Sequence, residues 1–328
     1  MHFALSISTL IFAFMASVSA FPSQRRTITR RAEYTDVCEV GYCTLNGGTT
    51  GGSSGDTVTV TSIDELSGAV SADGASIIIV DGSLEGSDTM RVSSDKTIIG
   101  TYGSSITGVG FLVKDVSNVI LRNLAISKVL ADNGDAITIQ AASNVWVDHC
   151  DLSSDMDNGK DYYDGLLDIT HASEYVTVSN TFLHDHYKAS LVGHSDNNGD
   201  EDEGHLLVTY ANNYWYNINS RGPSVRFGTA HILNSYYLAC NGAINTRMGA
   251  EVLVESTQFE DCGDEVIESK DSDEEGYAVV NDVDLGDSEN TASTGSITED
   301  DLGYSYTLVG SDVARDTVYG TAGNTLTF

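Results

Sequence analysis

The stretch VWVDHCDL, residues 145–152, shows the pattern on which most of this chain is built. It contains an apolar or β-branched run, then a small polar residue, then a second apolar pair. The pattern occurs six times at intervals of 22 to 32 residues. The other copies are VILRNLAI (119–126), VTVSNTFL (176–183), VTYANNYW (208–215), AHILNSYY (230–237) and VLVESTQF (252–259). Short strands that recur at such a period, with turn residues between them, predict a solenoid.

The interval between copies indicates the kind of solenoid. The two long intervals contain inserts, residues 155–163 and 195–203, and without them each interval matches one coil of three short strands and three turns. We therefore predict an all-β fold, a parallel β-helix. The only good helical periodicity runs from Ile63 to Val70, with Ser62 as its N-cap.

The fifth residues of the six copies form a column of mostly polar side chains. They are Asn123, His149, Asn180, Asn212, Asn234 and Ser256. Because successive rungs lie roughly 4.8 Å apart, we expect these side chains to stack inside the coil and to satisfy buried turn groups. The alternative is ordinary strand alternation, in which polar residues merely face solvent.

The N-terminal residues predict export from the cell. Residues 2–20 form an apolar segment of secretory length that ends in a small-x-small pattern, so we expect a signal peptide over 1–20. Residues 21–31 end in Arg30-Arg31, which resembles a dibasic processing site; the alternative is that these arginines are solvated charges in a tail. The mature domain would span residues 32–328, and no later run is apolar enough to cross a membrane. We expect a secreted protein.

The charge of the chain limits its partners. The net charge is -32, and removal of residues 1–31 takes away four arginines and no acid, which leaves -36 from twelve basic residues against 48 acids. Such a charge argues against nucleic acid and is consistent with a monomer kept apart by self-repulsion. The chain has five cysteines, an odd number. For an oxidising compartment we predict disulfide bonds between Cys38 and Cys43 and between Cys240 and Cys262.

Three carboxylates fall close together when the repeat is put in register. Asp164 and Asp168 lie two residues on either side of the level of Asp135 on the preceding rung, so all three are expected to share one outward face. Carboxylates this close repel each other unless a hard cation binds them, and oxygen ligands at irregular spacing suit Ca²⁺. Asn133 or Asp132 could add a fourth oxygen. The alternative is that these acids only face solvent.

Four of the few basic residues follow within 60 positions. They are Lys188, Arg221, Arg226 and Arg247, with Pro223 between the first two arginines. On a protein that repels anions, a cation site beside such a row indicates a groove for an acidic, repeating ligand. The alternative is that these residues pair with the many acids of the chain.

Four motifs identify a family. VWVDH (145–149), DGLLDI (164–169), HDHYKASLVGHSD (184–196) and RGPSVR (221–226) resemble polysaccharide lyase family 1, the pectate and pectin lyases, over roughly residues 38–328. The resemblance implies a single-stranded right-handed parallel β-helix and β-elimination of polygalacturonate or de-esterified pectin. It also implies Ca²⁺ on Asp135, Asp164 and Asp168, a catalytic Arg221, and substrate contacts by Lys188 and Arg226.

Three other functions are weighed against this one. A pectin lyase acts on methyl-esterified chains without Ca²⁺ and lacks the acid cluster. A polygalacturonase-type hydrolase needs two carboxylates around a water and would not need RGPSVR. A noncatalytic adhesin would leave the clustered basic residues unexplained.

Overall fold

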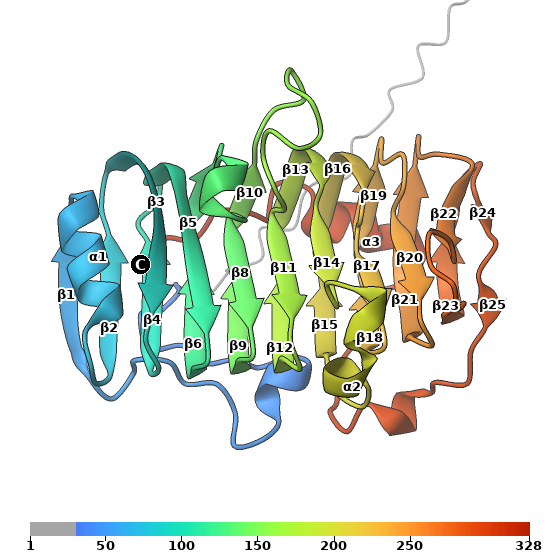
Figure 1. Cartoon of the computed structure of the whole chain (residues 1–328), viewed down its shortest axis with the longest axis horizontal. Helices are drawn as coiled ribbons and strands as arrows, with labels where there is room; N and C mark the ends of the chain where they lie inside the picture. Colours follow the sequence, from blue (N-terminus) through green and yellow to red (C-terminus); the bar gives the residue numbers. More distant parts are fainter. Residues whose placement is uncertain (1–30) are drawn as a thin grey trace, which may run out of the picture. The chain divides into compact units, whose positions relative to one another are not determined.

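The computed structural model describes residues 31–328 (Figure 1). The predicted signal peptide and nearly all of the predicted propeptide lie outside the described residues. Within 31–328 the chain winds as a parallel β-helix whose strands pair in parallel, which confirms the predicted fold class. No helix in this part of the chain is long and apolar enough to span a bilayer.

Three parallel sheets run along the coil, and we call the first of them sheet A. Its strands pair in chain order, one per coil, for example Val145 with Val176 and Val176 with Val208. They are β1 (Asp56–Val60), β2 (Ser76–Val80), β4 (Lys96–Gly100), β6 (Ser117–Arg122), β9 (Ser143–Asp148), β12 (Glu174–Ser179), β15 (Leu207–Ala211), β18 (Thr229–Leu233), β21 (Glu251–Glu260), β23 (Tyr277–Asp284) and β25 (Ser293–Thr294).

Sheet B carries the residues that form the candidate site. Its strands are β3 (Ser83–Val92), β5 (Ser105–Lys114), β8 (Ile137–Gln140), β11 (Leu167–Thr170), β14 (Ser190–Val192), β17 (Ser224–Arg226), β20 (Ile244–Arg247), β22 (Glu265–Glu268) and β24 (Glu289–Asn290). Most are only three or four residues long, so the chain turns a corner soon after each one.

Sheet C lies between the other two along the chain. The long strands β3, β5 and β21 take part in it as well as in a neighbouring sheet. Its remaining strands are β7 (Ala125–Ser127), β10 (Asp151–Ser153), β13 (Phe182–Lys188), β16 (Tyr214–Ser220) and β19 (Tyr236–Leu238). In each coil the chain runs from sheet A through sheet C to sheet B, so the loops between C and B border the sheet B face.

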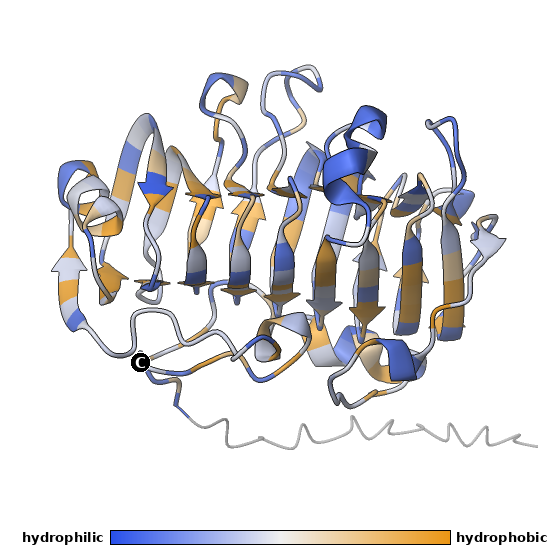
Figure 2. Ribbon diagram, turned by 60° about the horizontal axis from the view of Figure 1, so that its bottom comes forward, coloured by the Kyte–Doolittle hydropathy of each residue, from blue (hydrophilic) through white to orange (hydrophobic). Residues whose placement is uncertain are grey.

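The interior of the coil is apolar, and Figure 2 shows apolar and polar bands alternating along the strands. Val145, Val147, Val176 and Val178 are fully buried on successive coils. Alternation puts these side chains on one face of each strand, where they stack in columns. The motif VWVDH therefore supplies two core valines as well as polar residues.

The predicted polar column exists, but it does not lie inside the coil. All six of its residues have a left-handed backbone conformation and form the corner between sheets A and C. The side chains of Asn123, Asn180, Asn234 and Ser256 bind neighbouring coils or other segments; Asn180, for example, donates to Asp148 Oδ1 at 2.9 Å. The interior position is the following residue, where Thr181 N donates to the fully buried Asn213 Oδ1 at 2.8 Å. The left-handed corner turns the next side chain inward, which a strict two-residue alternation does not predict.

The short helices cap the coil or form its inserts. The predicted helix is confirmed as α1 (Ile63–Ser71), with the Ser62 hydroxyl accepting from Glu65 N and with Leu66 and Val70 buried over the first coils. The insert 195–203 forms η3 (Asp196–Asn198) and α2 (Gly199–Asp202). The other helices are η1 (Tyr42–Thr44), η2 (Ala131–Asn133), η4 (Glu299–Asp301) and α3 (Ser311–Val318).

Both ends of the described chain run along the outside of the coil. Cys43 N donates to Thr177 Oγ1 on sheet A, and the C-terminal Phe328 stacks on Tyr34 at 4.9 Å between ring centres. Near the C-terminus, Leu326 N donates to the corner residue Asn123. These segments cover outer strand faces that would otherwise meet water.

One predicted disulfide is confirmed and the other is wrong. Cys38 and Cys43 are bonded. Cys240 and Cys262 are both free. Each of these two thiols instead donates to backbone carbonyls of its own and the preceding coil, which satisfies the sulfur atoms without a covalent bridge.

Candidate active site

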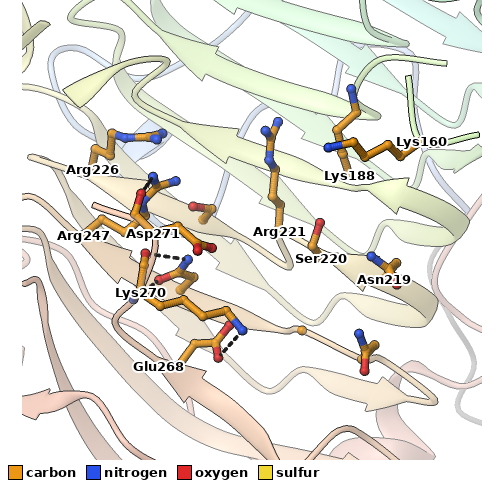
Figure 3. A pocket seen from close by; sticks show the side chains of 14 residues that line it. Lys160, Lys188, Asn219, Ser220, Arg221, Arg226, Arg247, Glu268, Lys270 and Asp271 are labelled. Carbon is orange, nitrogen blue, oxygen red and sulfur yellow. Dashed lines mark hydrogen bonds and ion pairs between the residues drawn. The ribbon is translucent and has the colours of Figure 1, made fainter. Parts of the chain in front are cut away.

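A cavity of about 440 Å³ opens on the face of sheet B, bordered by the loops that arrive from sheet C (Figure 3). Its lining includes six of the twelve Lys and Arg residues of 32–328. They are Lys160, Lys188, Arg221, Arg226, Arg247 and Lys270. In so acidic a protein, half of the positive charge gathers in one pocket. Sequence reasoning identified four of these residues and missed Lys160, which lies in an insert, and Lys270, which lies in an acid-rich segment.

Arg221 stands near the middle of this pocket (Figure 3). It occupies the corner between β16 and β17 with φ of 63°, and its carbonyl accepts from Ser190 N at 2.7 Å. The backbone is thus held to the adjacent coil. Among the described residues, the guanidinium has no hydrogen-bond or ion-pair partner, so its donors face the cavity. The adjoining Ser224 hydroxyl is buried and likewise has no partner within 31–328.

Lys188 lies beside Arg221 at the end of β13. Its Nζ is 3.0 Å from Asp164 Oδ1 and 3.4 Å from Asp161 Oδ1. Lys160 approaches from the insert 155–163, and Figure 3 shows it near Lys188. This side of the pocket therefore holds two ammonium groups around space that an anion could fill.

Arg226 and Arg247 line the other side and share one carboxylate. Arg226 Nε lies 2.5 Å from Asp196 Oδ1, and Arg247 Nη2 lies 3.7 Å from the same atom. Arg226 Nη1 also donates to Gly193 O at 2.9 Å. Burial lowers the pKa of Arg247, and the nearby Arg226 lowers it further. The insert 195–203, through Asp196, thus fixes both guanidiniums at the rim of the pocket.

The three predicted metal ligands are close together, although the register differs by one residue from the prediction. Ile137 pairs with Leu167, so Asp135 lies opposite Gly165. A side chain at Gly165 would put its Cβ 2.6 Å from Asp168 Oδ1 and 2.8 Å from Asp135 Oδ1. The absence of a side chain there lets two carboxylates converge. Asp164 turns instead toward Lys188.

The two converging carboxylates carry negative charge that their surroundings only partly compensate. Burial raises the pKa of Asp168 well above its ordinary value and Asp135 adds to the rise, while Arg221 opposes it. Burial also raises the pKa of Asp135 despite a hydrogen bond from Thr138. A buried pair of this kind is stabilised by a bound cation.

The described residues contain no set of three His, Cys, Asp or Glu side chains already arranged around one ion. The donor chemistry nevertheless fits a hard cation, because Asp135 and Asp168 converge and Asp164 lies within their electrostatic reach. Of the two suggested fourth ligands, Asn133 donates to Ser87 at 2.9 Å, and Asp132 is exposed.

His186 is a site residue that sequence reasoning missed. It lies beneath the loop that carries Asp164, where its Nε2 donates to Asp164 O at 2.7 Å. Nδ1 then accepts from the Ser154 hydroxyl at 2.5 Å. Burial lowers the pKa of His186 to about 4, so the ring is neutral and holds the loop by hydrogen bonds alone. Its place in HDHYKASLVGHSD was the only sequence signal.

The sequence of the whole domain matches a known family. A family model described as pectate lyase matches residues 26–326. The chain belongs to the pectate lyase family. A probable pectate lyase B of Aspergillus flavus is 57% identical, with 98% of this chain and 99% of the relative covered. Pectate lyase plyB of Emericella nidulans is 55% identical, with 97% and 99% covered.

Solved pectate lyase structures share the fold. A pectate lyase from Bacillus sp. N165, solved in complex with trigalacturonate, superposes with a TM-score of 0.80 at 28% identity, covering 87% of this chain and 98% of that one. A pectate lyase variant from Xanthomonas campestris gives a TM-score of 0.76 at 27% identity, covering 88% and 98%. The chain is therefore a polysaccharide-degrading enzyme of the pectate lyase class with the β-helix of that family.

Proposed function

We propose that this pectate lyase is a secreted, Ca²⁺-dependent enzyme that cleaves (1→4)-α-D-galacturonan by β-elimination and releases 4,5-unsaturated oligogalacturonates. The observation that carries the proposal is the guanidinium of Arg221, which has no partner within residues 31–328 and lies in a basic pocket within electrostatic reach of Asp168, one of two converging buried carboxylates. Residues 2–20 support secretion, and the charge of the chain supports a monomer that binds neither nucleic acid nor membrane.

The pocket suits a chain of uronates. Lys188 and Arg226 would bind substrate carboxylates on either side of Arg221, with Arg able to make paired hydrogen bonds. Asp135, Asp164 and Asp168 would hold Ca²⁺. When bound, the cation supplies positive charge that stabilises the carboxylate as it gains enolate character.

Proton removal is assigned to Arg221. It would take the C5 proton of the uronate while Lys188 stabilises the charge that develops on the adjacent carboxylate. The electron pair then forms the C4–C5 double bond as the C4–O bond breaks, and the departing glycosidic oxygen takes a proton from solvent. The charged guanidinium cannot itself accept a proton, and arginine strongly favours that charged form. Alkaline solution favours the neutral guanidine, the form that can accept a proton.

One assay tests the proposal against its alternatives. Polygalacturonate is incubated with the enzyme, with and without a Ca²⁺ chelator, and the ultraviolet absorbance of the unsaturated product is followed. We expect absorbance to rise and the chelator to abolish the rise. Chain cleavage without absorbance would indicate a hydrolase, and full activity in chelator would indicate a pectin lyase.

A further inference from the structure

The charge of the groove changes along the axis of the coil. Around Arg221 the pocket is basic, but two coils further, at the end of β22 and just after it, the lining includes Glu268, Lys270 and Asp271. The segment 264–275, DEVIESKDSDEE, contains seven acids and a single base. A uniform polyuronate in the groove would therefore meet attraction at one end and acidic side chains at the other.

The one base of this segment, Lys270, is already paired with an acid. Lys270 Nζ lies 2.7 Å from Glu268 Oε2, and Figure 3 shows the pair beneath Arg221. Glu268 is only 3% exposed, whereas the Lys270 side chain is 53% exposed. Asn245 holds the backbone of Lys270 through two hydrogen bonds, at 3.1 and 3.2 Å. The pair is thus a built part of the groove floor.

We propose that Glu268, paired with Lys270, makes this end of the groove select an uncharged, methyl-esterified galacturonate. The inference rests on the proposed function and adds a specificity to it. A free uronate here would lie beside a buried carboxylate whose only cation is already engaged, and like charges in a partly buried site repel strongly. A methyl ester avoids that repulsion. The preferred substrate is then a galacturonan with a free carboxylate at Arg221 and an ester about two coils along.

Two substitutions at the pair should change specificity in opposite directions. Glu268→Gln removes the buried anion and frees Lys270 for a carboxylate. Lys270→Met leaves the anion without its partner. The readout is the ratio of kcat/KM on partially methyl-esterified pectin to kcat/KM on polygalacturonate. Glu268→Gln should lower this ratio about fivefold, mainly by raising activity on polygalacturonate, and Lys270→Met should raise it by a similar factor.

Glu265→Gln provides the matched control, because Glu265 lies on the same strand but is exposed and outside the pocket lining. It should leave the ratio within about twofold of wild type, since a solvent-exposed charge is well screened. Thermal unfolding of each variant shows whether it is folded.

The outcomes are separable. Opposite shifts in the two variants, with none in the control, support the specificity. A ratio that stays unchanged in the pair, or that moves the same way in both, overturns it. If wild type makes no unsaturated product from either substrate, the proposed function itself has failed, which is a different result.

Discussion

Two arginines, Arg122 and Arg221, lie in the same coil architecture and have opposite surroundings. Arg122, on sheet A, donates to Asp148 at 2.9 Å and to Asp36 at 3.0 Å, and it lies 5.1 Å from the ring centre of Trp146. Arg221, facing the pocket at sheet B, has no such partner among the described residues. Arg122 is saturated, in that carboxylates and a backbone carbonyl of the protein occupy its donors, and it serves the fold. Arg221 keeps its donors free of such bonds within residues 31–328, so it can serve a ligand.

The saturated site is formed by the motif VWVDH. Asp148 is 1% exposed and accepts from Arg122, Ser179 and Asn180. The adjacent His149 ring nitrogen lies 2.8 Å from the same carboxylate. Arg122 Nη1 also donates to Glu33 O, which ties the N-terminal segment to the coil. The most recognisable motif of the chain thus stabilises the fold at a distance from the pocket.

The largest effect is expected from a change at Arg221, in the pocket. Arg221→Lys keeps a positive charge but moves the proton acceptor, so kcat should fall about 10²- to 10⁴-fold. Binding of oligogalacturonate should persist, because Lys188 and Arg226 remain. Steady-state kinetics and a binding titration measure both, with Arg315→Lys, an exposed change on α3, as the control. A kcat within a few-fold of wild type would remove Arg221 from the role of base.

The next largest effect is expected from a change at Asp148, the buried partner of Arg122. Asp148→Asn leaves Arg122 buried without its main counter-charge and should lower the free energy of unfolding by about 3–5 kcal/mol. The kcat of the molecules that stay folded should not change. Denaturant unfolding and activity measured on the same samples test this. An active-site role for VWVDH would appear instead as lost kcat with little loss of stability.

The carboxylate of Asp148 also makes the stability of the fold depend on pH. The pKa of Asp148 is lowered in the folded state because, although burial opposes it, His149 and Arg122 favour the anion. A lowered folded pKa means that its stabilisation is present above the ordinary value of 3.8 and is lost as the pH falls through the folded pKa. Wild type should therefore lose this contribution below about pH 3.8, and Asp148→Asn should lack that part of the slope.

A smaller effect is expected at Asp168, whose buried carboxylate converges on that of Asp135. Asp168→Ala should weaken Ca²⁺ affinity about 10- to 100-fold, with circular dichroism unchanged. Because burial raises the folded pKa of Asp168, metal-free wild type loses stability as the pH rises above 3.8. Asp168→Ala should therefore be more stable than wild type in chelator near neutral pH, and added Ca²⁺ should reverse the order. Calorimetric titration and thermal melts provide the two readouts, and equal melts in chelator would contradict the prediction.

The smallest expected effect sharpens the distinction between the inside and the corner of the coil. Asn213→Leu removes the acceptor for Thr181 N and should cost about 1–3 kcal/mol. Asn180→Leu, at the half-buried corner, should cost less, because water can replace its hydrogen bond to Asp148. Matched denaturation curves compare the two variants. A larger loss of stability in Asn180→Leu than in Asn213→Leu would mean that the corner residues, and not the residues that follow them, provide the buried hydrogen bonds.

Several features of this protein followed from its sequence. The recurrence of apolar pairs at coil-length intervals predicted the β-helix, since each coil must bury the same face against the next, and the family resemblance supported that prediction. The scarcity of basic residues made Lys188, Arg221, Arg226 and Arg247 conspicuous. The motifs carried the family, and the Ser62-capped helix followed from local capping chemistry alone.

Other features depended on the tertiary structure. The left-handed corners shifted the interior stack by one residue, and the register of Asp135 opposite Gly165 shifted the carboxylates in the same way. Lys160, His186 and Lys270 could not be ranked from sequence, because their roles come from coils and loops that are not adjacent in the chain. The ion pairs also depended on the tertiary structure. The sequence does not show that Arg122 is bonded to carboxylates and Arg221 is not. Only the folded coil shows this, because Coulomb interactions depend on distance in space.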